Sequence, residues 1–278
     1  MSHSGGAERT GRQSALKCAG AAVDHQHMEA ATFAGVFGAI VGSFLNVVIY
    51  RMPRRESLIA PGSHCPTCNT PVRPYDNVPI ISWLILHGHC RSCGERISPR
   101  YPLVEAMTAA LCVGAVLAHD SAVAIALSLL TVLVVVPVAL IDLEHRIIPN
   151  RITLPAAVLA LGLGLALDPA GEPARLIAAV AAGGFLLLAA LAYPGGMGMG
   201  DVKLAALLGL LLGAAVAPAL LIALLSGTLV GVVVIARKGA AAGRKTAIPF
   251  GPFLALGALV AVFAGGWLVD LYVNHFVH

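Results

Sequence analysis

Residues 193–213 read YPGGMGMGDVKLAALLGLLLG and join a glycine-rich loop to an apolar run that continues to residue 216. Asp201 and Lys203 stand at the start of that run and are the only charged residues in the stretch. An ionised carboxylate next to a bilayer is costly and usually marks a functional site. The stretch therefore predicts a membrane helix that begins with a functional carboxylate.

The rest of the chain has the composition of a protein built into a membrane. Of its 278 residues, 58% are hydrophobic and 12% are charged, and the mean hydropathy is +0.85. Soluble domains carry about a quarter charged residues. The apolar runs are continuous and lack the alternation of an outer-membrane barrel. We therefore predict an all-α polytopic membrane protein.

Apolar windows long enough to span a bilayer, about 17–25 residues, recur from residue 30 onward and predict about eight transmembrane helices. Two of them are short, and the sequence APAL at 217–220 fits either a turn or a kink, so the count lies between seven and eight. The expected spans are 30–50, 102–119, 121–141, 152–167, 174–193, 202–216, 217–236 and 251–273.

The chain divides into three regions by composition. Residues 1–28 are polar and predict a disordered extension. Residues 29–110 hold the first span and a polar loop with four cysteines, and residues 111–278 hold the remaining helices.

The basic residues predict which side of the membrane each loop occupies. With eight spans, the loops 51–101, 142–151, 194–203 and 237–250 fall on one side and hold 14 of the 18 Lys and Arg residues. Positively charged loops stay in the cytosol, so we expect this side to be cytosolic, in the cytoplasmic (inner) membrane, with both termini outside. The net charge of +4 is modest, and no nucleic-acid partner is expected.

A second carboxylate falls on the same side as Asp201. Asp142, within VALIDLEHRIIPNRITLP, lies where one span ends and shortly before the next begins. Two neighbouring carboxylates cannot both ionise cheaply, so one holds a proton while the other can activate water. This arrangement can hydrolyse a peptide bond without a nucleophilic side chain, and it predicts Asp142 and Asp201 as a catalytic pair.

The glycines before Asp201 are expected to adopt positive φ and to approach another main chain closely. Lys203 is expected to hold Asp201 in its charged form or to contact lipid phosphate. The predicted substrate-loop and supporting residues are Gly195, Gly196, Gly198, Gly200 and Lys203. The alternative is structural: Asp201 caps a helix and Asp142 pairs with Arg146.

The polar loop at 51–101 contains two CxxC pairs, Cys65 with Cys68 and Cys90 with Cys93, separated by 21 residues. This spacing fits a tetrahedral zinc site with four thiolate ligands. A cytosolic setting disfavours disulfides, and a loop with little apolar content needs such a crosslink. Four reduced thiols or a redox pair remain the alternatives. His87 and His89 are too awkwardly spaced to be ligands.

Several long motifs resemble one known family. GMGMGDVKL at 196–204 and DLEHRIIPN at 142–150 resemble the two active-site motifs of the type IV prepilin leader peptidases, which are GxGD aspartyl proteases. The resemblance extends over about residues 35–260. It includes GSFLNVVIYRMP at 42–53, YDNVPIISWL at 75–84, RYPLVEAMTA at 100–109 and IPFGPFLALG at 248–257.

The resemblance implies a bifunctional membrane enzyme. Members cleave the leader from type IV prepilins or pseudopilins at the cytosolic face, with the aspartates that match Asp142 and Asp201. Members that carry the cysteine region also methylate the new N-terminal residue with S-adenosylmethionine. The resemblance thus makes 29–110 a methyltransferase-associated region and 111–278 an aspartyl peptidase domain.

No glycine fingerprint of a soluble methyltransferase follows a strand, so the methyl-donor site has only polar candidates. Asn46 can instead hydrogen-bond between helices, and Glu105 can instead pair with Arg100. The candidates are Asn46, Arg51, Glu56, Asp76, Asn77 and Glu105.

Three other functions compete with this interpretation. A transporter predicts charged residues near the bilayer midplane and broken helices in matched halves, whereas the acids here stand at loop edges. A zinc-binding membrane scaffold without catalysis would tolerate loss of either aspartate. A peptidase that has lost methyl transfer would leave its products unmethylated.

Overall fold

The structure is a computed structural model that describes residues 5–193, 196–239 and 248–276. Its elements are almost all helical, with two isolated β-bridges in the cysteine loop. The α-helices are α1 (Gly5–Arg51), α2 (Ile81–Ile85), α3 (Arg100–Leu117), α4 (Ala122–His145), α5 (Asn150–Leu167), α6 (Glu172–Ala192), α7 (Met199–Leu212), α8 (Val216–Lys238) and α10 (Gly251–Phe276). Two short 3-10 helices, η1 (Pro74–Asn77) and η2 (Gly213–Ala215), complete the fold.

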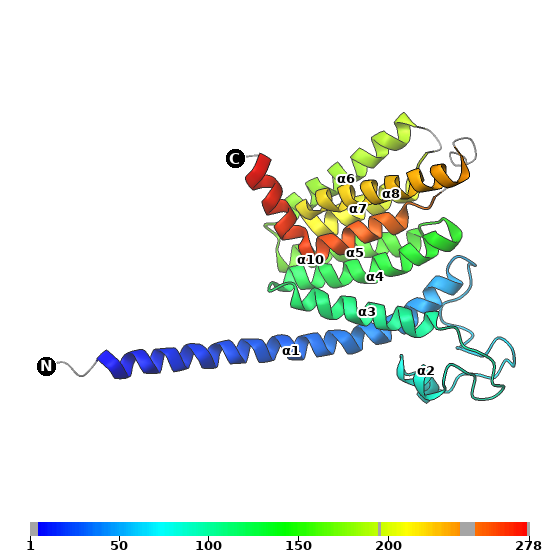
Figure 1. The fold of residues 1–278 in the computed structure, drawn as a ribbon, viewed down its shortest axis with the longest axis horizontal. Coiled ribbons are helices and arrows are strands. Elements are labelled where there is room, and N and C mark those ends of the chain that lie inside the picture. The colour runs from blue at the N-terminus through cyan, green and yellow to red at the C-terminus, as the bar shows by residue number, and fades with distance from the viewer. Residues whose placement is uncertain (1–4, 194–195, 240–247, 277–278) are drawn as a thin grey trace.

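The long helices lie side by side in a stack (Figure 1). Successive helices run in opposite directions, so the cysteine loop, the end of α4, the end of α6 and the end of α8 gather on the right of that view. These are the loops that the charge distribution assigns to one side of the membrane. The prediction of an all-helical membrane fold is confirmed.

Seven helical stretches of the described chain are long and apolar enough to cross a membrane. One of them, Met199–Lys238, covers 40 residues and includes both α7 and α8. The chain breaks there at Gly213, whose φ of 57° suits a residue without a side chain. The helix before this break, α7, has only 14 residues, which explains why the sequence leaves the count between seven and eight.

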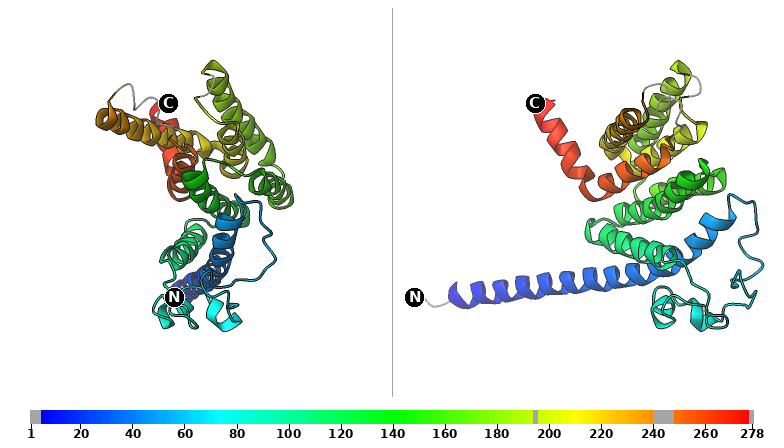
Figure 2. Two further views of the ribbon diagram at one scale, coloured as in Figure 1. Left: turned by 90° about the vertical axis from the view of Figure 1, so that its right-hand side faces the viewer. Right: turned by 45° about the vertical axis from the view of Figure 1, so that its right-hand side comes forward.

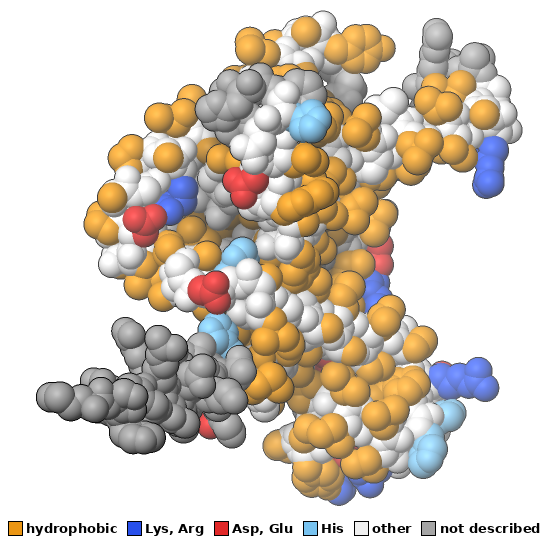
Figure 3. All heavy atoms as spheres, turned by 60° about the vertical axis from the view of Figure 1, so that its left-hand side comes forward, with side chains coloured by type: hydrophobic (Ala, Val, Ile, Leu, Met, Phe, Trp, Pro, Cys, Tyr) orange, Lys and Arg blue, Asp and Glu red, His pale blue; other side chains and the backbone are white. Residues whose placement is uncertain are grey.

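Apolar side chains fill two clusters and also cover the outside. One core joins α4 to α5, α6, α7, α8 and α10, and a second joins α1, α3 and α4. Many large apolar side chains, such as Val180 and Leu188, are largely exposed. They cover much of the face shown in Figure 3, as expected of helices that face lipid.

Small residues set the distance between α1 and α3. A Cβ on Gly38 would lie 2.8 Å from Ala109 Cα, and a Cβ on Gly42 would lie 2.9 Å from Glu105 Cα. Such close backbone approach is how membrane helices gain packing contacts.

The backbone of residues 5–28 continues α1 as a helix, where the composition predicts a disordered extension. The three-region division stays a prediction.

Three charged groups join the α5–α6 turn at the end of the stack opposite the cysteine loop. Arg175 donates from Nη1 to Asp168 Oδ2 and from Nε to Glu172 Oε2, each at 2.9 Å. Gly164 is needed beside them, because a Cβ there would overlap the Glu172 carboxylate. The cluster closes this turn with one arginine that pairs with two carboxylates, of which Glu172 is buried.

Candidate active site

Asp142 lies in the last turn of α4, and its side chain is buried. Arg146 ends this helix in a left-handed conformation with a φ of 54°, and its backbone N–H donates to Asp142 O at 2.9 Å. The carboxylate is held by a distant residue, because its Oδ2 accepts the N–H of Gly251 at 2.9 Å. Gly251 is the first residue of α10. Two helix ends therefore meet at this carboxylate.

Asp201 lies in the first turn of α7 and is also buried. Its Oδ2 accepts the backbone N–H of Gly198, the N-cap residue, at 3.2 Å. This is the helix-capping contact that the alternative interpretation expects. It involves only Oδ2, so capping and a chemical role for the carboxylate are compatible.

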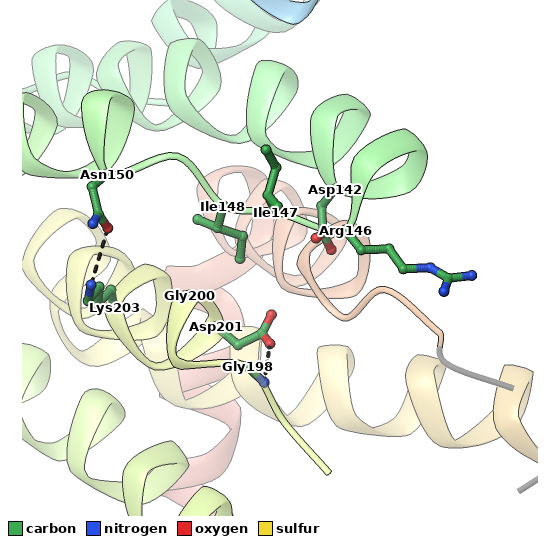
Figure 4. A pocket seen from close by; sticks show the side chains of 9 residues that line it. All are labelled: Asp142, Arg146, Ile147, Ile148, Asn150, Gly198, Gly200, Asp201 and Lys203. Carbon is green, nitrogen blue, oxygen red and sulfur yellow. Dashed lines mark hydrogen bonds between the residues drawn. The ribbon is translucent and has the colours of Figure 1, made fainter. Parts of the chain in front are cut away.

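The two carboxylates line one cavity of about 320 Å³. Figure 4 shows them on separate helices, pointing into the space between α4 and α7. Arg146 points away from Asp142 in that view, and the two side chains form no ion pair in the described part of the chain. The structural alternative, in which Asp142 pairs with Arg146, is therefore wrong. The lining residues are Asp142, Arg146, Ile147, Ile148, Asn150, Gly198, Gly200, Asp201 and Lys203.

The glycines before Asp201 act through close packing. Gly198 has a φ of −80°, and neither Gly196 nor Gly200 is among the positive-φ residues of the described chain, so the expected positive φ is wrong for these three. A Cβ on Gly200 would lie 3.0 Å from Ile148 Cβ, which explains why this position has no side chain. Gly195 lies outside the described residues.

Lys203 contacts a residue that the sequence did not single out. Its Nζ donates to Asn150 Oδ1 at 3.2 Å, which joins the start of α7 to the start of α5 (Figure 4).

Gly251, which holds the Asp142 carboxylate, is the other residue of the site that sequence reasoning missed. The motif IPFGPFLALG marks its neighbourhood, but the useful group is a backbone N–H, which has no signature in the sequence.

The four cysteines of the loop come together. Their Sγ atoms all lie within 4.8 Å of one another, and Cys65 Sγ lies 3.8 Å from Cys93 Sγ. The two CxxC segments have the same backbone. The residue directly after each second cysteine, Asn69 or Gly94, has positive φ. Its N–H donates to the carbonyl of the first cysteine of the same segment. Each segment is closed by a β-bridge, His64 with Pro71 and His89 with Arg96.

This donor set suits a tetrahedral zinc ion. Zn–S bonds of about 2.3 Å place the sulfurs of a tetrahedron roughly 3.8 Å apart, which matches the Cys65–Cys93 separation. Hydrogen bonds with the Thr70 side chain and backbone lower the pKa of Cys68 to about 6, whereas desolvation and the neighbouring thiols raise the pKa of Cys93 to about 12. The case for zinc therefore rests on the positions of the sulfurs.

The six methyl-donor candidates have different surroundings. Asn46 donates to Tyr101 O of α3 at 3.1 Å, which confirms the inter-helix hydrogen bond. Glu105 Oε2 accepts the N–H of Ile80 at 2.7 Å, and Arg100 pairs with Glu144 instead, so the expected Glu105–Arg100 pair is wrong.

The other four candidates lie in or near the cysteine loop. Asp76 pairs with Arg91, whose guanidinium donates to both carboxylate oxygens and holds the pKa of Asp76 below its usual range. Glu56 is exposed. Arg51 and Asn77 line a second cavity together.

Comparison with known proteins gives matches along most of the chain. Residues 36–119 match the Bacterial Peptidase A24 N-terminal domain, and residues 125–235 match the Type IV leader peptidase family. A Prepilin leader peptidase/N-methyltransferase of Dichelobacter nodosus is 35% identical over 274 residues, which cover 86% of this chain and 91% of the relative.

Two further relatives carry the same name and a similar likeness. The protein of Aeromonas hydrophila is 35% identical over 87% of this chain and 93% of its own length. The protein of Pseudomonas aeruginosa is 35% identical over 86% of this chain and 92% of its own length. No solved structure matches the chain at comparable significance.

Proposed function

The chain belongs to the type IV prepilin leader peptidase/N-methyltransferase family, and from this premise we propose that it cleaves the leader from prepilins or pseudopilins and methylates the new amino terminus. The observation that carries the first activity is the cavity shared by Asp142 and Asp201. Two carboxylates from helices far apart in the sequence face one space at a membrane surface. That is the arrangement that acid–base hydrolysis of a peptide bond requires.

In the proposed mechanism the two carboxylates share one proton. The charged member accepts a proton from water as the water oxygen attacks the scissile carbonyl carbon, and the protonated member gives its proton to the leaving amine. The backbone N–H groups of Gly251 and Gly198 each hold one oxygen of a carboxylate. The other oxygen of each group is left for water or substrate.

The basic loops support a position of this cavity on the cytosolic face of the cytoplasmic membrane. The ends of α4 and α6, the cysteine loop and the end of α8 share one side of the helix stack (Figure 1), and the positive-inside rule makes that side cytosolic. Substrates would meet the aspartates there while their apolar parts stay in lipid.

For the second activity, S-adenosylmethionine would supply the methyl group. A zinc ion on Cys65, Cys68, Cys90 and Cys93 would fold the loop that stands beside α1, because the four sulfurs have the spacing that zinc accepts. In this role the metal is structural, since all four positions of a tetrahedral ion are filled by thiolates.

Cleavage by Asp142→Asn and Asp201→Asn variants tests the peptidase. Each variant keeps the size and hydrogen-bonding capacity of the side chain but removes the base, so turnover of a prepilin in membranes should fall by about 10²–10⁴-fold. Asp270→Asn, on an exposed carboxylate near the end of α10, is the matched control and should cleave normally. A non-catalytic scaffold or a transporter predicts that cleavage in the membranes is the same for the wild type and all three variants.

A further inference from the structure

A second cavity, of about 880 Å³, lies between one face of α1 and the first half of the cysteine loop. It shares no lining residue with the aspartate cavity. One wall comes from α1 with eight residues, the two loop segments 58–63 and 77–81 give five residues each, and α3 gives one. The lining residues are Gly35, Val36, Ala39, Ile40, Ser43, Phe44, Val47, Arg51, Leu58, Ile59, Pro61, Gly62, Ser63, Asn77, Val78, Pro79, Ile80, Ile81 and Ala109.

The two ends of this cavity have different chemistry. At the loop end the polar side chains Arg51, Ser63 and Asn77 line it. At the other end, Val36 and Ile40 are inside the membrane span and more than half exposed. Sixteen residues separate Gly35 from Arg51, which is roughly 24 Å along a helix. One end therefore opens toward the aqueous loop side and the other toward lipid.

Methyl transfer onto a membrane-anchored amine needs both kinds of opening. The donor is a charged, water-soluble molecule, and the acceptor is the amino terminus of a chain whose apolar part stays in the bilayer. We propose that the loop end of this cavity binds S-adenosylmethionine and that its lipid-facing end admits the acceptor. The inference rests on the proposed methyltransferase activity and gives it a site.

The lining suits the donor. Ligand pockets of a few hundred to about 1,000 Å³ are mostly apolar, with a few polar groups that fix orientation. Arg51 gives one hydrogen bond, from Nη1, to Ser57 O at 3.0 Å, which leaves further guanidinium donors for the carboxylate of the methionine part. Asn77 is exposed and offers an amide to the polar edge of the adenosine. Leu58, Ile59 and Ile81 provide apolar surface for the adenine ring.

Two buried polar residues hold this cavity in shape. Glu105 on α3 accepts the N–H of Ile80 and so fixes the segment 77–81 over α1. Asn46 on α1 donates to Tyr101 O on α3. Both are therefore positioning residues, and Arg51 and Asn77 are the donor contacts among the six polar candidates.

The transfer balances without another reactant. The lone pair of the neutral amine nitrogen forms the N–C bond to the methyl carbon as the C–S bond breaks. The sulfur keeps the electron pair of that bond, which gives a neutral thioether, and one proton leaves the nitrogen for water. The products are the N-methylated chain, S-adenosylhomocysteine and a proton.

Direct binding to the purified full chain in lipid nanodiscs tests the site. Equilibrium dialysis with tritiated S-adenosylmethionine should give a dissociation constant that Arg51→Met weakens about 10- to 100-fold, as expected for loss of a charged hydrogen bond. Asn77→Ala should weaken it less. Arg54→Met is the matched control, because Arg54 stacks 4.0 Å from the Tyr50 ring and does not line the cavity. Ultraviolet crosslinking of the bound donor should label peptides from 58–63 or 77–81.

Prepilin cleavage by the same preparations reports folding and separates the possible failures. Arg51→Met should cleave like the wild type. If the wild type binds the donor and Arg51→Met, Asn77→Ala and Arg54→Met all bind it equally well, the site is wrong while the methyltransferase activity stands. If the wild type cleaves but neither binds the donor nor methylates its product, the methyltransferase proposal itself fails.

Discussion

At the scale of single residues, each aspartate of the pair is fixed by one peptide N–H from the start of a helix. Gly251 begins α10 and Gly198 precedes α7. The N-terminal end of a helix carries a partial positive charge, which favours a carboxylate. The two contacts hold Oδ2 of each side chain. Positioning of this kind is what keeps a catalytic group within reach of its substrate.

Gly251→Ala tests this positioning. The new Cβ would lie 2.7 Å from Asp142 Oδ2, so the carboxylate must move, and a shift of about 1 Å can reduce turnover roughly 100-fold. Alanine favours helix more than glycine does, so folding should not suffer. We expect a lower kcat with little change in KM, measured on a prepilin peptide in nanodiscs. Gly231→Ala is the control, since no atom stands within 4 Å of its added Cβ. Equal kcat values for the two variants would contradict the positioning role.

Asp168 gives a pH dependence with a definite sign. Its hydrogen bond from Arg175, aided by the N–H of Gly171, holds the pKa of Asp168 below its usual range. A carboxylate with a depressed folded-state pKa adds stability above its unfolded pKa of about 3.9, and that stability is lost as the pH falls through the folded value.

Thermal unfolding of Asp168→Asn should show this loss. Its melting temperature should lie below that of the wild type at pH 7, and the gap should close below about pH 4. Asp270→Asn, on an exposed carboxylate, should show no such gap. A gap that stays constant down to pH 3 would mean that the Asp168 charge is not the cause.

The sequence identified both aspartates because a carboxylate at the edge of an apolar run is rare and costly. It could not identify Gly251, which is 109 residues from Asp142 and contributes a group that nearly every residue carries. The same limit applies to Glu105. The alternative to a methyl-donor role for its carboxylate was a pair with an arginine, but the carboxylate accepts a backbone N–H from a loop 25 residues away.

At the scale of elements, the cysteine loop contrasts with the helices around it. Between Met52 and Pro99 only Cys65, Ser82 and Gly88 are buried, so the loop has almost no apolar core. Its order depends on the two matching CxxC turns and on the Asp76–Arg91 pair. The spacing of the cysteines predicted the cluster, because each CxxC turn is local and needs no knowledge of the fold.

Metal removal should therefore unfold this element selectively. The wild type should contain about one zinc ion per chain, and Cys65→Ser or a strong chelator should remove it. The loop should then become sensitive to limited proteolysis, while the helices stay protected by the bilayer. Thr67→Ala, inside the same CxxC turn, is the matched control and should keep its zinc. Zinc content is measured by mass spectrometry. A metal-free wild type with a protease-resistant loop would rule out the structural metal.

At the scale of the whole molecule, the helices form two groups around separate cavities. Figure 2 shows α1 and α3 with the cysteine loop on one side, and the helices from α5 onward on the other, with α4 between them. The length and composition of the apolar runs predicted the helices, because each membrane span must form all its backbone hydrogen bonds within the same segment. They did not predict which helix faces pack against each other, since a face that contacts lipid and a face that contacts another helix are equally apolar. The cavity at Arg51 and Asn77 depends on such a meeting.

The sidedness of the molecule can be tested with cysteines introduced one at a time into a Cys18→Ala background. The labelling is compared with that background, because five native cysteines remain in it. Asp120, whose side chain is fully exposed, lies in the turn between α3 and α4. Arg237 lies at the opposite end of the stack, in the last turn of α8. Because basic loops stay in the cytosol, an impermeant maleimide should label Asp120→Cys in intact spheroplasts and Arg237→Cys only after lysis. The reverse pattern would invert the topology.

The contact between Gly251 and Asp142 also has a consequence for how the protein is made. Asp142 and Asp201 leave the ribosome well before Gly251, yet the donor that holds Asp142 belongs to α10, the most C-terminal helix described. A nascent chain arrested before that helix carries both acids without this anchor. Newly synthesised protein should therefore gain proteolytic competence only when α10 is inserted.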